Sequence, residues 1–179
     1  MQALIAAGMT PDDHLLDIGC GSLRLGHKAV PYLKPGHYWG TDASHALMRH
    51  GRLHELPNPE ALPEDRLIED ASFAFPGVPD TITIAIAFGV FTHLPHADLQ
   101  TALTNLRRLP NLCTVLFTVF LAPEAAGSTR QPDGVVTHPD RPPYHVSDAQ
   151  VSTTIQEAGF TPARLPMLLP RGQVLWTAT

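Results

Sequence analysis

The sequence has 179 residues, of which 44% are hydrophobic and 16% are charged, which is too apolar for a disordered chain and too interrupted by polar residues for a membrane span. Twelve lysines and arginines against 17 aspartates and glutamates give a net charge of -5, which leaves no basic surface for a phosphate backbone. We therefore expect one soluble domain over residues 1–179, with no nucleic-acid or membrane partner.

Cysteine and histidine usage gives no sign of a disulfide framework or of a metal centre. Cys20 and Cys113 have no ligand spacing, which is typical of a reducing, cytoplasmic compartment. The ten histidines show no pair at metal spacing on a convincing helix, and the close pair His93 and His96 is split by Pro95, so we predict no metal. The opening MQALIAAGMTPDD lacks the basic start of a signal peptide and is interpreted as a short or truncated N-terminal helix.

The first part of the chain alternates predicted strands and helices. HLLDIG (14–19) predicts a buried strand that runs into a glycine turn, and a short helix is expected within 23–33. HYWGTDAS (37–44) predicts a second strand, and Ser44 is the expected N-cap of the next helix. A brief third strand follows at 66–69.

The middle of the chain contains the most strand-like run. TITIAIAFGVF (81–91) is rich in β-branched residues and apolar on both faces, as in the centre of a parallel sheet. A helix is expected over 95–109, because proline stands at its start and leucines lie along one face. CTVLFTVFLA (113–122) predicts a fifth buried strand.

The last part begins with a loop of about 25 residues at 121–146, a length that is usually functional. Ser147 then caps a helix that stops at Ala158-Gly159, and 160–179 predicts a closing hairpin. This order predicts an α/β fold: a Rossmann-like, doubly wound, mostly parallel seven-stranded sheet ending in an antiparallel hairpin, with helices on both faces. Such sheets bind ligands at the carboxyl ends of their strands.

Asp17-Ile18-Gly19-Cys20-Gly21 forms a glycine-rich turn directly after the first strand, where the backbone can approach a ligand closely. A dinucleotide fingerprint needs a glycine where Arg24 stands, so a nicotinamide cofactor is disfavoured. The acid at 17 would repel a pyrophosphate, but it suits a cofactor that carries an ammonium group, which favours S-adenosylmethionine. Asp42 stands where an acid is expected to hold ribose hydroxyls.

The segments LLDIGCGSLRLG, YWGTDAS, EDASFAF and IAFGVFTHLP follow one another in an order that resembles the class I S-adenosylmethionine-dependent methyltransferases, over about residues 10–179. Leu23 departs from the family pattern, which has a third glycine there. The cofactor-binding residues that the resemblance implies are Asp17, Gly19, Cys20 and Gly21 for the methionine part, Asp42 and Ala43 for the ribose, Asp70 and Ala71 for the adenine, and Phe88 for the methionine side.

The resemblance implies an enzyme that uses S-adenosylmethionine as cofactor. We expect methyl transfer to an O or N atom of a small-molecule or sugar-like acceptor, with His93, Tyr144 or His145 assisting deprotonation as the candidate catalytic residues. The alternative is a non-catalytic binding module that keeps the methyltransferase fold. The sequence predicts neither the identity of the acceptor nor the oligomeric state.

Overall fold

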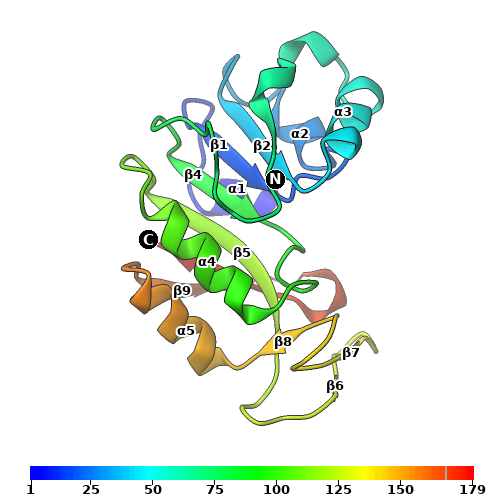
Figure 1. Cartoon of the computed structure of the whole chain (residues 1–179), viewed down its shortest axis with the longest axis vertical. Helices are drawn as coiled ribbons and strands as arrows, with labels where there is room; N and C mark the ends of the chain where they lie inside the picture. The colour runs from blue at the N-terminus through cyan, green and yellow to red at the C-terminus, as the bar shows by residue number, and fades with distance from the viewer. Residues whose placement is uncertain (168) are drawn as a thin grey trace. The chain divides into compact units, whose positions relative to one another are not determined.

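The computed structural model describes residues 1–167 and 169–179, and the chain divides into two compact units (Figure 1). Unit 1 comprises Met1–Ile86 and Arg108–Cys113, and unit 2 comprises Ala87–Arg107 and Thr114–Thr179. The expectation of a single domain stays a prediction. No helix among the described residues has the length and apolar character needed to cross a membrane.

Unit 1 is built on parallel strands in the order β3-β2-β1-β4. Every residue of β1 is buried, because the strand has a neighbour on either side and carries LLDI. Its elements are α1 (Gln2–Ala6), β1 (Leu15–Ile18), α2 (Gly26–Ala29), β2 (Tyr38–Asp42), α3 (His45–His54), the 3-10 turns η1 (Pro59–Ala61) and η2 (Glu64–Arg66), β3 (Leu67–Glu69) and β4 (Ile84–Ala87), which runs to the boundary of the unit.

The register of these strands brings their carboxyl ends together. Asp17 lies opposite Gly40, and Asp42 lies opposite Glu69. The predicted cap of the following helix is confirmed, since the Ser44 hydroxyl accepts a hydrogen bond from Leu47 N at 3.2 Å. The loops that leave β1, β2 and β3 therefore start at one edge of the sheet.

Unit 2 is centred on β5, whose six inner residues are buried. β10 pairs antiparallel with both β5 and β9, which confirms the predicted closing hairpin. α4 and α5 pack side by side, and the Thr154 hydroxyl lies 2.9 Å from His96 Nε2 (Figure 1). The elements are α4 (His96–Leu106), β5 (Thr114–Leu121), β6 (Thr129–Arg130), β7 (Val136–Thr137), β8 (His145–Val146), α5 (Asp148–Glu157), β9 (Pro162–Leu165), the 3-10 turn η3 (Pro170–Gly172) and β10 (Val174–Ala178).

Two elements differ from the sequence predictions. The strand expected over 81–91 covers only Ile84–Ala87, because Gly89 turns the chain at a φ of 75° and the Thr92 hydroxyl donates to the Gly89 carbonyl at 3.1 Å. The predicted loop at 121–146 contains the β6-β7 hairpin and the strand β8, which pairs parallel with the end of β5. Apart from the β6-β7 hairpin, the described residues contain eight paired strands when β8 is counted. The sequence predicted seven.

Candidate functional site

The glycine-rich turn leaves β1 in a conformation that explains its glycines. Gly19 and Gly21 have φ values of 65° and 53°, in the left-handed region that glycine adopts without steric cost. Cys20, between them, is buried and donates its N–H to the Thr41 carbonyl at 3.0 Å, which ties the turn to β2. The turn is therefore a fixed part of the sheet edge, with its backbone uncovered by side chains at the two glycines.

Leu23 occupies the position where the family pattern has a third glycine, and it takes the backbone conformation of a glycine. Its φ is 63°, and its side chain is fully buried. A side chain at Gly26 would stand only 3.1 Å from Leu23 Cβ, so the glycine at 26 leaves the space that the leucine fills. The departure from the pattern therefore preserves the shape of the turn.

Asp17 is the buried acid of the site. It is 3% exposed, and its Oδ2 accepts a hydrogen bond from the Tyr38 hydroxyl at 2.6 Å. Burial raises the pKa of Asp17 to about 7, against the opposing effect of the Tyr38 hydrogen bond. A carboxyl group of this kind gains its charge most readily when a cation comes close to it.

Asp42 holds the glycine turn from the end of β2. Its Oδ2 accepts the N–H of Gly21 at 2.9 Å, and its Oδ1 accepts the N–H of Ser44 at 2.9 Å. Each carboxylate oxygen can accept a further hydrogen bond, so both stay available to a pair of hydroxyls. Ala43, next to it, is exposed.

Asp70 organises the loop that follows β3. Its Oδ1 accepts the N–H and hydroxyl of Ser72 at 2.9 and 3.0 Å, and its Oδ2 accepts the N–H of Phe75 at 2.7 Å. Burial raises the pKa of Asp70, but these hydrogen bonds outweigh burial and hold the pKa below its ordinary value. Asp70 N–H also donates to the Asp42 carbonyl at 2.9 Å, while Ala71 is exposed.

Unit 1 thus gathers eight of the nine predicted cofactor-binding residues at the ends of three neighbouring strands. Backbone and carboxylate hydrogen bonds link the loops of β1, β2 and β3 in sequence, through Gly21 to Asp42 and through Asp42 to Asp70. The ninth residue, Phe88, belongs to unit 2, where it is 43% exposed directly before the turn at Gly89. The Gly89 N–H is held by the buried hydroxyl of Thr118 on β5, at 2.8 Å.

The three predicted catalytic residues also lie in unit 2. Tyr144 N–H donates to the Thr92 carbonyl at 2.8 Å, which places Tyr144 beside the segment that carries the exposed His93. His145 is 7% exposed, and its Nδ1 lies 2.8 Å from the Thr137 hydroxyl. Tyr144 and the His93 segment are therefore adjacent, whereas His145 is buried with its imidazole against Thr137 of β7.

Two residues that support the site are not among those predicted from the sequence. The sequence indicates Tyr38 only as part of a strand, whereas in the structure its hydroxyl donates a hydrogen bond to Asp17. Gly51 lies inside α3 and touches the glycine turn so closely that a Cβ would stand 2.3 Å from the Ser22 carbonyl oxygen. A glycine inside an amphipathic helix is a usable signal of such contact, whereas no local pattern marks the tyrosine.

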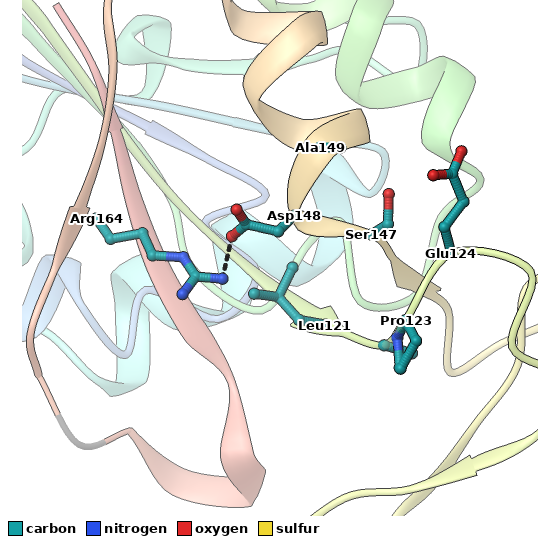
Figure 2. Close-up of a pocket in the computed structure, with 8 residues that line it drawn as sticks. Leu121, Pro123, Glu124, Ser147, Asp148, Ala149 and Arg164 are labelled. Carbon is teal, nitrogen blue, oxygen red and sulfur yellow. Dashed lines mark ion pairs between the residues drawn. The ribbon is translucent and has the colours of Figure 1, made fainter.

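Unit 2 also has an open hollow of about 470 Å³ at the carboxyl end of β5 (Figure 2). Arg164 of β9 pairs with Asp148 at the start of α5 across it. None of the predicted site residues lines the hollow, whose lining residues are Leu121, Ala122, Pro123, Glu124, Ser147, Asp148, Ala149 and Arg164.

Comparisons with known proteins agree with this arrangement. Residues 16–111 match the family model described as a methyltransferase domain, which is more than half of the chain. No curated protein sequence matches the chain.

Solved structures share the fold over nearly the whole chain. Magnesium protoporphyrin IX methyltransferase from Synechocystis, with bound S-adenosylmethionine, is 16% identical over 99% of this chain and 74% of its own, with a TM-score of 0.66. The YcgJ protein of Bacillus subtilis is 13% identical over 99% and 95%, with a TM-score of 0.69. The glycopeptide N-methyltransferase MtfA, in complex with S-adenosylhomocysteine, is 15% identical over 99% and 84%, with a TM-score of 0.67.

The predicted fold class, Rossmann-like α/β with mostly parallel strands and an antiparallel end, is confirmed by these similarities. The family match confirms the predicted enzyme class, and with it S-adenosylmethionine as cofactor. The chain therefore belongs to the class I S-adenosylmethionine-dependent methyltransferases.

Proposed function

We propose that this methyltransferase transfers the methyl group of S-adenosylmethionine to an O or N atom of a small-molecule or sugar-like acceptor. The observation that carries the proposal is the linked set of loops at the ends of β1, β2 and β3, with Asp17 on β1, Asp42 on β2 and Asp70 directly after β3. Three acids with different environments can recognise three different parts of one cofactor.

The chemistry of these residues fits the cofactor part by part. Asp17, whose charge burial disfavours, suits the ammonium group of the methionine moiety. Each carboxylate oxygen of Asp42 accepts one backbone N–H and keeps acceptor capacity for the two ribose hydroxyls. Gly19 and Gly21 leave backbone uncovered for the methionine moiety, with Cys20 between them.

The remaining predicted contacts complete the proposal. Asp70, with Ala71 after it, is proposed to meet the adenine amino group, since its hydrogen bonds with Ser72 and Phe75 hold an ionised acceptor in place. Ala43 follows Asp42 in the chain and is proposed to line the ribose as well. Phe88 is proposed to line the methionine side, which its exposed ring allows.

The bound cofactor supplies an electrophilic methyl group, so the protein has to align a nucleophile, exclude water and receive a proton. We propose His93 and Tyr144 as the groups that assist deprotonation of the acceptor, because the Tyr144-to-Thr92 hydrogen bond holds their segments together. His145 has its Nδ1 at Thr137, and this contact favours a role in holding the Tyr144 segment.

A small-molecule acceptor is supported by the charge of the chain. The net charge of -5 with 12 lysines and arginines disfavours a nucleic-acid acceptor. Among similar structures, one is named for a porphyrin substrate and another for a glycopeptide, and these names describe those proteins alone.

The test begins with calorimetric titration of the full chain with S-adenosylmethionine and S-adenosylhomocysteine, with NADH as the control ligand. We expect micromolar binding of both thioether ligands, lost in Asp42→Ala and kept in Asp65→Ala, which removes an exposed acid of the same unit. Failure of the wild type to bind either ligand would remove the proposed cofactor site.

The second step is an acceptor screen with methyl-labelled cofactor and a cell extract that has been separated by molecular size. Label in the small-molecule fraction supports the proposed acceptor class. Label only in protein or nucleic acid contradicts the acceptor class, and no label in any fraction of an extract that supports other methyltransferases favours the non-catalytic binding module.

A further inference from the structure

α3 carries two histidines one turn apart on its exposed surface. His50 and His54 are both exposed, and their ring centres lie 4.4 Å apart with a 41° angle between the ring planes. The prediction that no histidine pair lies at metal spacing on a helix is wrong. Residues 45–54 form a regular helix, and the i, i+4 spacing of His50 and His54 puts both rings on one side of it.

The separation of the two rings suits a shared metal ion. With metal–nitrogen distances of about 2.1 Å, two imidazoles in adjacent coordination positions have ring centres roughly 4.5 to 5 Å apart. The observed ring-centre distance of 4.4 Å is close to this range, so the helix holds the two imidazoles at a separation that one ion can bridge. We propose that His50 and His54 form a bidentate site for a divalent transition-metal ion on α3.

The surroundings of the pair leave the site open. The two arginines of α3 are directed to the segment 59–64, with Arg49 Nε 3.6 Å from Glu64 and Arg52 Nη2 3.7 Å from Glu60. His45 joins the same contact, 3.9 Å from Glu64. These cationic groups therefore stand on the other side of the helix from the histidine pair.

The donor set defines the class of ion. Two imidazole nitrogens favour Cu²⁺, Ni²⁺ and Zn²⁺ over Mg²⁺ and Ca²⁺, which prefer oxygen ligands. No group of three or more histidine, cysteine or acidic side chains in the described part of the chain could hold a metal. The site thus offers two protein ligands, and the remaining coordination positions are left to water.

A metal on this pair would stabilise the helix that supports the glycine turn. Gly51 lies between the two histidines in sequence and abuts the Ser22 carbonyl. Linking positions 50 and 54 through an ion fixes the last turns of α3. The metal binds only the helical form with both ligands, so it shifts the unfolding equilibrium toward the folded protein.

The test is calorimetric titration of the full chain, without a histidine tag, with NiCl₂ at neutral pH. We expect one micromolar site in the wild type. His50→Gln and His54→Gln should each weaken binding roughly tenfold or more, because each leaves a single imidazole. His45→Gln, on the same helix, should bind as the wild type does, and circular dichroism should show that all three variants are folded.

Thermal unfolding gives a second measurement. At a free Ni²⁺ concentration about 100 times the Kd, the midpoint should rise by roughly 5 to 10 °C in the wild type and in His45→Gln, and not in the other two variants. The proposal is overturned if the wild type binds no Ni²⁺ below about 1 mM. It is also overturned if His50→Gln and His54→Gln bind as tightly as the wild type, or if His45→Gln loses as much affinity as they do.

Discussion

At the scale of single residues, the buried Asp17 that we propose to contact the cofactor also affects the stability of the ligand-free protein. Its carboxyl is buried among β1 and its neighbours, with the Tyr38 hydroxyl as a hydrogen-bond donor. Because burial raises its pKa to about 7, the folded protein holds the proton that the unfolded chain releases near pH 4. The resulting stabilisation is present at low pH and is lost as the pH rises toward 7.

Asp17→Asn should therefore stabilise the ligand-free chain at high pH. Asparagine cannot ionise and keeps an oxygen for Tyr38, so we expect the free energy of unfolding to rise by about 2 kcal/mol at pH 8 and to change far less at pH 5. The same variant should bind S-adenosylmethionine at least roughly tenfold more weakly, since it removes the carboxylate that we propose as the partner of the ammonium group. Urea unfolding at both pH values and calorimetry measure the two effects. A stability gain that is equal at pH 5 and pH 8 would contradict the ionisation argument.

Leu23 tests whether the glycine-like backbone of the turn is strained. Both Leu23→Ala and Leu23→Gly remove a fully buried side chain, so both should cost roughly 2 to 5 kcal/mol. At a φ of 63° the glycine variant should be the more stable of the two, by about 1 kcal/mol, because glycine has no Cβ to clash.

The matched control is Leu103, which is buried in α4. There the order should reverse, with the alanine variant about 1 kcal/mol more stable than the glycine variant. Denaturant midpoints at constant m-value measure both pairs. The same order at the two positions would show that the backbone of Leu23 carries no strain.

At the scale of elements, α3 positions the turn through its closest contact. Gly51 leaves no room for a methyl group, since a Cβ would meet the backbone of Ser22 at 2.3 Å and neither backbone can yield cheaply. Gly51→Ala should therefore destabilise the protein by about 1 to 3 kcal/mol, although glycine-to-alanine changes in open helix positions are stabilising. It should also weaken cofactor binding, because the turn is displaced.

Gly127→Ala is the control for that substitution. A Cβ at Gly127 meets no atom within 4 Å, and the residue has no left-handed backbone. Its unfolding free energy should stay within about 0.5 kcal/mol of the wild type, with unchanged cofactor affinity. If Gly51→Ala proves as well tolerated, the close packing of α3 on the turn is not what holds the turn in place.

The elements that could be predicted are those with a local signal. The strand at 15–18, the cap at Ser44 and the stop at Gly159 follow from apolar runs, capping chemistry and a glycine with a φ of 83°. The strand at 84–87 was predicted too long, since β-branched residues also stand outside it, at 81–83 before the strand and at Val90 after the turn at Gly89. The β6-β7 hairpin was missed because two-residue strands carry too short a pattern to detect.

The same distinction applies to the site. The positions of Asp17, Asp42 and Asp70 could be predicted because Asp17 and Asp42 lie at the ends of predicted strands and Asp70 directly follows one. The contact of Tyr38 with Asp17, the support by Gly51 and the enclosure of His145 depend on side chains that meet only after folding. Such contacts between segments far apart in the chain leave no periodic trace in the sequence.

At the scale of the whole molecule, the proposed cofactor contacts are unevenly divided between the two units. Eight of the nine lie in unit 1, and the hydrogen bonds that link their loops run within that unit. The β6-β7 hairpin of unit 2 has its own buried polar contacts, in which Gln131 Nε2 donates to the Thr137 hydroxyl at 3.0 Å. A ligand that binds the loops of β1, β2 and β3 should therefore protect the two parts of the chain unequally.

Hydrogen exchange in the presence of S-adenosylhomocysteine should reveal this inequality. At about 100 times the Kd, amides that exchange only when the site opens should slow by up to roughly 100-fold, because every such opening must first release the ligand. We expect this effect at the amides of Cys20, Gly21 and Asp70, which are bonded within the linked loops, and little effect at Gly134 in the hairpin turn. NADH should slow none of them. Protection confined to the hairpin, or spread evenly over both units, would mean that the three acids of unit 1 are not where the ligand is held.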